Sequence, residues 1–87
     1  MDFTALERAV KLIEAAPDRG VPLVFYGLIK MMTLDQRGCV FGLARLRDLD
    51  CDQRQLAYDL MELYVAGGNR TPEWAEAVRH LDAVVNG

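Results

Sequence analysis

Apolar residues recur at helical spacing from the start of the chain. One stripe, with members three and four residues apart, consists of Phe3, Leu6, Val10 and Ile13. This spacing places side chains on one side of an α-helix. Thr4 and Glu7 match the capping-box pattern, in which a hydroxyl and a carboxylate satisfy the first free backbone N–H groups. Pro17 cannot continue the helical hydrogen-bond ladder, so the pattern predicts a first helix over residues 4–16.

The segment 21–34 is apolar on nearly every side, which is typical of a helix buried at the centre of a small protein. Pro22 suits the first turn of such a helix. A β-strand over 21–26 is the competing interpretation, but the apolar pattern is too long for one strand and ends in Met and Leu, which favour helix. We predict a central helix, closed by Gly38 and followed by a short apolar link over 39–42.

The middle of the chain predicts a short helix and then a long one. Residues 43–47 are interpreted as one or two helical turns. Asp50 and Asp52 each precede a glutamine by three residues, so either carboxylate suits the N-cap of the next helix. The apolar face of that helix consists of Leu56, Leu60, Leu63 and Tyr64. Gly67 and Gly68 end it, because glycine readily adopts the left-handed conformation that follows many helices.

The last helix has the strongest start signal. Thr71 offers a capping hydroxyl, Pro72 suits the first helical position, and Glu73 places an acid where the helix dipole favours it. The apolar stripe that follows consists of Trp74, Val78, Leu81 and Val85. We predict a helix that closes at residues 86–87.

Together these elements predict an all-α single domain over residues 1–87, a compact bundle of about five helices. The second helix is expected at the centre, with the first, fourth and fifth helices packed on it. The predicted core consists of the large apolar residues at inward positions, namely Leu6, Val10, Ile13, Leu23, Phe25, Leu28, Ile29, Met32, Leu46, Leu56, Leu60, Leu63, Trp74, Val78 and Leu81.

The composition contains more apolar residues than one small core needs. Apolar residues make up 52% of the chain, although a domain of this size buries only roughly 60–65% of the surface that its unfolded chain exposes. The surplus predicts a protein partner or a homodimer. The first and last helices suit a dimer seam because their apolar faces are broadened by Ala5, Ala9, Leu12, Ala77 and Val84. The candidate interaction surface consists of Leu12, Phe25, Tyr26, Met31, Trp74 and Val84.

The chain shows no targeting or membrane-spanning pattern. Asp2 and Glu7 stand where a secretory signal would have basic residues. The longest mainly apolar run, 21–34, is too short for a bilayer, which requires about 20 residues. We therefore expect a cytoplasmic protein that does not interact with a membrane. Its eight arginines against two lysines are typical of a GC-rich bacterial or phage genome.

The inventory of catalytic side chains is small. The sequence contains no serine and one histidine, His80, which follows Glu76 by four residues, a spacing at which a surface pair can form on a helix. Cys39 and Cys51 form no metal-binding motif and are predicted to remain thiols. We predict no enzymatic activity, no catalytic residue, no cofactor and no metal.

An alternating run of Asp48, Asp50 and Asp52 begins like a calcium-binding loop. Such a loop requires glycine at its sixth position and glutamate at its twelfth. This chain has Gln53 and Asp59 at those positions. Helix capping is therefore the preferred interpretation.

The order of elements over residues 22–68 resembles the three-helix core of helix-turn-helix domains. A Leu-Ala pair opens the middle helix and glycines follow the last one, as in that family, although Arg47 stands where an apolar residue is usual. The resemblance implies DNA contacts from Arg45, Arg47, Arg54, Gln55 and Tyr58.

The charge pattern argues against DNA binding. The formal net charge is −3, and the charges are scattered with no block of one sign. DNA affinity requires several basic residues on one face, whereas the helix after Asp50 carries more acids than bases. The sequence therefore predicts a small protein–protein interaction module, such as an adaptor, accessory subunit or inhibitor, acting through an apolar helical surface. A helix-turn-helix-like DNA-binding transcriptional regulator is the alternative.

Overall fold

Helices account for nearly all of the chain that the structure describes. The computed structural model describes residues 1–34 and 43–87, and these ranges contain no strand. Their α-helices are α1 (Thr4–Ala15), α2 (Gly20–Leu34), α3 (Cys51–Val65) and α4 (Pro72–Asn86), and their 3-10 helices are η1 (Leu43–Asp48) and η2 (Gly68–Arg70). The all-α prediction is confirmed. The predicted Gly38 cap and the link over 39–42 lie outside the described residues.

The third predicted helix is a 3-10 helix, so the described ranges contain four α-helices rather than five. This element, η1, cannot extend because Asp50 adopts an extended backbone conformation as the N-cap of α3. Leu46 of η1 is half-buried, and Leu49 just after it is buried in the core. The segment therefore attaches to the bundle through two leucines rather than through a helical face.

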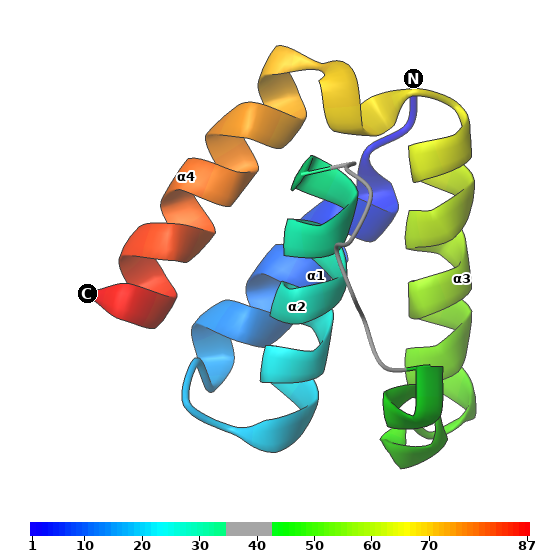
Figure 1. Ribbon diagram of the computed structural model, residues 1–87, viewed down its shortest axis with the longest axis vertical. Helices are drawn as coiled ribbons and strands as arrows, with labels where there is room; N and C mark the ends of the chain where they lie inside the picture. The colour runs from blue at the N-terminus through cyan, green and yellow to red at the C-terminus, as the bar shows by residue number, and fades with distance from the viewer. Residues whose placement is uncertain (35–42) are drawn as a thin grey trace.

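The helices are arranged with α1 and α2 between α3 and α4 (Figure 1). In this view α1 and α4 run in one direction, while α2 and α3 run in the other. Both α1 and α2 contact each of the other three α-helices. The prediction that the other three α-helices pack on α2 is confirmed, but α2 does not occupy the centre alone. The first helix shares the centre because Leu6, Ala9 and Ile13 are buried along it, and Ala9 is small enough for close packing.

Most of the predicted core is confirmed. The residues with the largest completely buried side chains are Trp74, Phe25, Ile13, Leu28, Ile29, Leu60 and Leu81. The core also includes Ala9, Val24, Leu49 and Ala57, which the sequence analysis did not assign to it. Two of these are alanines, whereas the predicted core included only large apolar residues.

Three residues of the predicted core lie nearer the surface. Leu23 is exposed, whereas Val10 and Leu46 are half-buried. For Leu23 the reason is the orientation of α2 about its axis. Phe25 and Ile29 point inward, and Leu23 lies about 200° around the helix from Phe25 because each residue advances by about 100°.

The ends of α3 and α4 form as the sequence predicts. Of the two candidate caps for α3, Asp50 is the one used. Its Oδ1 accepts from the backbone N–H of Gln53 at 2.9 Å, and Gln53 Oε1 accepts from the backbone N–H of Asp50 at 2.9 Å. After α3 the chain turns at Gly67, which has a φ of 89°. The Thr71 hydroxyl caps α4 by accepting from the backbone N–H of Trp74 at 3.2 Å.

The first helix, α1, starts at residue 4 as predicted, but its cap differs from the prediction. Phe3 is the N-cap, and the expected capping box between Thr4 and Glu7 does not form. The Asp2 carboxylate instead accepts hydrogen bonds from both the backbone N–H and the hydroxyl of Thr4. Because the hydroxyl of Thr4 donates to Asp2, the helix starts one residue earlier than a Thr4 cap would allow. The helix ends at Ala15, one residue before the predicted end.

Candidate functional site

A groove of about 310 Å³ lies between α1 and α4, the helices from the two ends of the chain. Its apolar lining consists of Phe3, Leu6, Val10 and Ala77. Its charged lining consists of Glu7, Lys11, Glu14 and Glu73, all of which are exposed. The groove therefore combines an apolar floor with a rim of three carboxylates and one ammonium group.

The periodicity of α1 explains one wall of this groove. Phe3, Leu6 and Val10 follow one another at helical spacing, so they form a continuous apolar strip. Glu7 and Glu14 are seven residues apart, which is two helical turns, so both carboxylates lie along the same edge of that strip. On α4 the opposite wall contains Glu73 and, four residues later, Ala77. The small side chain of Ala77 leaves room between the two helices.

A second, more polar groove of about 480 Å³ runs along the other side of α1, between that helix and α3. Its acidic residues are Asp2, Asp59 and Glu62, and Arg8 is its basic residue. The two grooves together hold six of the thirteen acidic residues of the chain and only two of the ten basic ones. The charges that look scattered in the sequence are therefore gathered unevenly by the fold.

One interhelical contact between polar side chains joins α1 to α4 near the end of α1. His80 Nε2 lies 3.3 Å from Glu14 Oε2, with both side chains about half exposed. The contact between His80 and Glu76 that their spacing allows does not form, and Glu76 accepts from Arg79 instead. Within the described ranges Glu7 and Glu73 form no ion pair. The charges of Glu7 and Glu73 are thus available to a bound molecule.

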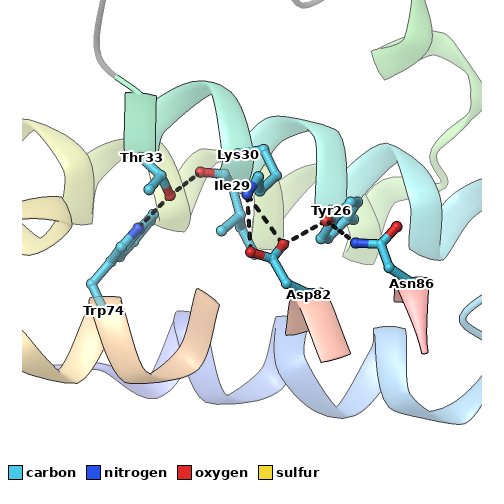
Figure 2. A network of polar contacts seen from close by, with 7 residues as sticks. All are labelled: Tyr26, Ile29, Lys30, Thr33, Trp74, Asp82 and Asn86. Carbon is cyan, nitrogen blue, oxygen red and sulfur yellow. Dashed lines mark hydrogen bonds and ion pairs between the residues drawn. The ribbon is translucent and has the colours of Figure 1, made fainter. Parts of the chain in front are cut away.

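A network of polar contacts holds α4 against α2 on another side of the bundle (Figure 2). Asp82 is its centre. The Tyr26 hydroxyl donates to Asp82 Oδ1 at 2.6 Å, and Lys30 Nζ lies 3.1 Å from both carboxylate oxygens. Asn86 Nδ2 donates to the Tyr26 hydroxyl at 3.3 Å. Each of these groups already has a partner from the facing helix, so the network acts as a clasp between α2 and α4.

The same helices are joined a second time through the indole of Trp74 (Figure 2). Its Nε1 donates to Thr33 Oγ1 at 2.8 Å, and this hydroxyl donates in turn to the backbone carbonyl of Ile29 at 2.7 Å. The chain satisfies the polar edge of a completely buried ring, as buried polar groups require.

The contacts of the clasp shift two pKa values. The pKa of Asp82 is lowered, first by the hydrogen bond from the Tyr26 hydroxyl and then by Lys30, while partial desolvation opposes the shift. The pKa of Tyr26 is raised, mainly by desolvation and by its hydrogen bond to Asp82. Both shifts favour the state in which Tyr26 is neutral and Asp82 is charged, which is the state that the clasp uses.

Stability is therefore expected to depend on Asp82 in a pH-dependent way. A lowered folded-state pKa contributes stability that is present above the unfolded pKa, near 3.8, and is lost as the pH falls through the folded value. Asp82→Asn should cost about 0.5–1 kcal/mol at neutral pH, because the pair is more than one-third exposed and screened by solvent. The difference from the wild-type protein should shrink below pH 4. Urea unfolding at a series of pH values measures it, with Asp48→Asn on η1 as control. An equal loss at pH 3 and pH 7 would contradict the assignment.

No known protein family, no curated protein and no solved structure matches the chain. In the part of the chain that the structure describes, no three His, Cys, Asp or Glu side chains are placed to hold a metal ion. None of the described helices is long and apolar enough to cross a membrane. Cys51 is exposed, and Cys39 lies outside the described residues.

The structure places two of the predicted interaction residues inside the protein. Phe25 and Trp74 are completely buried in the core, so they contribute to the fold and not to a surface. Both lie on helices whose apolar stripes are wide, and packing against neighbouring helices decides which side of each stripe is covered.

The other four predicted interaction residues, Leu12, Tyr26, Met31 and Val84, are half-buried. Leu12, Tyr26 and Met31 pack against the core. None of the four lines the groove between α1 and α4. The predicted surface thus does not include the groove, although the seven-residue spacing of Glu7 and Glu14 beside an apolar strip is a signal for it in the sequence.

The candidate DNA contacts are all exposed: Arg45, Arg47, Arg54, Gln55 and Tyr58. The first two belong to η1, and the others belong to the first half of α3. Gln55 donates to Asp59 at 2.9 Å, so its amide is engaged along the helix. The middle element of the helix-turn-helix resemblance is the 3-10 helix η1 rather than an α-helix.

Proposed function

We propose that the chain is a small protein–protein interaction module, an adaptor, accessory subunit or inhibitor, that binds its partner in the groove between α1 and α4. The observation that carries this proposal is the apolar floor with its carboxylate rim. Concave apolar sites with a few placed polar groups are typical binding sites. Burial of the floor supplies affinity, while the rim charges select and orient the partner. The module has no catalytic role and acts inside the cell.

The packing of the terminal helices favours a foreign partner over a second copy of this chain. The residues expected to form a dimer seam on α1 and α4 included Ala5, Leu12 and Ala77. These three pack against the core of their own chain, because α1 and α4 contact each other within the bundle. The apolar surplus is therefore partly consumed by the fold, and among the described residues the groove is a concave surface with an apolar floor.

Site-specific photo-crosslinking tests the proposal. A photoreactive residue at Lys11 on the rim should capture a partner in the cells that express the protein, whereas one at Arg47 on η1 should not. The captured protein, once identified and purified, should bind the wild-type chain and lose most of its affinity for Val10→Glu, which places a charge on the floor. Val84→Glu is the matched control because Val84 is half-buried on α4 but does not line the groove. Circular dichroism confirms that both variants remain helical. Equal binding by both variants would place the docking surface elsewhere.

The alternative function, DNA binding, has one supporting observation, which is the exposure of Arg45, Arg47 and Arg54 around the start of α3. Asp48, Asp50 and Asp52 lie between Arg47 and Arg54, so these six residues carry no basic excess. We therefore expect no shift of duplex DNA in a gel assay at about 50 mM salt, a concentration at which phosphate contacts are strong. A shift that weakens steeply with salt and disappears with Arg54→Ala would favour the regulator instead.

A further inference from the structure

We infer that the occupant of the α1–α4 groove is a basic amphipathic helix of the partner protein, with lysines or arginines about two turns apart. This inference rests on the proposed function and specifies its partner. The two helices of the groove are in contact and run in the same direction (Figure 1). Phe3, Leu6 and Val10 follow one another along α1, so the apolar floor is elongated and suits the apolar face of a third helix. Addition of an extended strand, another common mode of peptide binding, requires a free strand edge, and the described ranges contain no strand.

The carboxylates of the rim determine the charge of this helix and its spacing. Glu7 and Glu14 are two turns apart on α1, about 10 Å along the axis. A helix that lies along α1 presents residues i and i+7 at the same separation, so a base at one position meets Glu7 and a base at the other meets Glu14, whose Oε2 also contacts His80. Glu73 on the opposite wall faces the other flank of the apolar strip. The same charges repel the phosphates of nucleic acids and the headgroups of anionic membranes.

Lys11 gives the inference a second test, because its removal should change the affinity in the direction opposite to removal of the glutamates. It lies between Glu7 and Glu14 on α1 and belongs to the lining of the groove. Its positive charge offsets part of the acidic potential that a basic helix would meet. Removal of Lys11 should therefore strengthen binding of a basic helix, while removal of Glu7 or Glu14 should weaken it. Docking by apolar contact alone would not produce these opposite effects.

The experiment uses the full chain and two synthetic 16-residue helical peptides. Both carry leucines at three- and four-residue spacing; one carries lysines beside the apolar face, and the other carries glutamines at the same positions. Titration calorimetry measures affinity at 50 and 500 mM NaCl, and amide chemical shifts of Val10 and Ala77 report occupancy of the groove. The lysine peptide should bind about tenfold more tightly than the glutamine peptide at low salt, because each exposed ion pair increases the affinity about three- to fivefold. High salt should remove most of this difference.

Three variants test which charged side chains of the protein affect binding of the lysine peptide. Glu7→Gln with Glu14→Gln should weaken the lysine peptide about tenfold and leave the glutamine peptide unchanged. Lys11→Gln should tighten the lysine peptide about threefold. The matched control, Asp59→Asn with Glu62→Gln, removes two carboxylates from the groove on the other side of α1 and should have little effect.

The outcomes separate the inference from the proposed function. Equal affinity for both peptides, with shifts at Val10 and Ala77, would overturn the choice of a basic partner and leave the docking groove intact. A larger loss from the control variant than from the Glu7 and Glu14 variant would place the peptide in the other groove and overturn the inference. If neither peptide shifts Val10 or Ala77, and no partner is crosslinked from Lys11, both the inference and the proposed function fail.

Discussion

Trp74→Ala is expected to lower the free energy of unfolding by about 3–5 kcal/mol, the usual cost of removing a large buried aromatic side chain. Trp74 is the largest of the completely buried residues and sits in the first turn of α4. Its ring fills the space between α4 and α2, and its Nε1 donates to Thr33. The truncation therefore removes apolar burial and a hydrogen bond at once. Urea unfolding followed by circular dichroism measures the loss.

Two further variants keep this prediction testable if Trp74→Ala does not fold. A domain of 87 residues has a total stability of only about 4–13 kcal/mol. Trp74→Phe retains most of the ring and should be less costly than Trp74→Ala. Thr33→Val leaves the buried indole N–H without its acceptor and should cost about 1–3 kcal/mol. Glu76→Ala, an exposed position on the same helix, is the control. A loss for Trp74→Phe or Thr33→Val no larger than for Glu76→Ala would contradict the assigned packing.

The sequence predicted the local structure well because local structure depends on neighbouring residues. The Thr71 cap, the left-handed Gly67 and the capping box of Asp50 with Gln53 each require only residues within one turn. The failed capping box at Thr4 shows the limit of such patterns. The Asp2 carboxylate accepts hydrogen bonds from both the hydroxyl and the backbone N–H of Thr4, and Asp2 lies just outside the capping-box pattern, which begins at Thr4.

The pairing of helices was beyond what periodicity can predict. A stripe shows that one side of a helix is buried but not which helix covers it. The apolar faces of α1 and α4 therefore suggested a dimer seam, whereas in the structure these helices cover each other. For the same reason Trp74 and Phe25 were assigned to the interaction surface as well as to the core, and the structure confirms only the core assignment.

One wall of the candidate site follows from a local sequence pattern, whereas the other wall comes from a distant part of the chain. Glu7 and Glu14 lie on a predictable helix beside a predictable apolar strip. The opposite wall, with Glu73 and Ala77, comes from the other end of the chain and meets that strip only in the folded protein. The uneven distribution of acids has the same origin, since residues of one sign that are far apart in the sequence become neighbours along α1.

Leu60→Ala should destabilise the protein by about 2–5 kcal/mol, as expected for a buried large-to-small substitution that leaves a cavity. Leu60 is completely buried on the inward side of α3, which contacts both α1 and α2. Val65→Ala on the same helix is the matched control, because Val65 is 79% exposed and its truncation should change stability by less than about 0.5 kcal/mol. Urea unfolding of the two variants checks the prediction. Equal losses would mean that α3 is rotated about its axis relative to the described bundle, and its contacts with α1 and α2 would have to be reassigned.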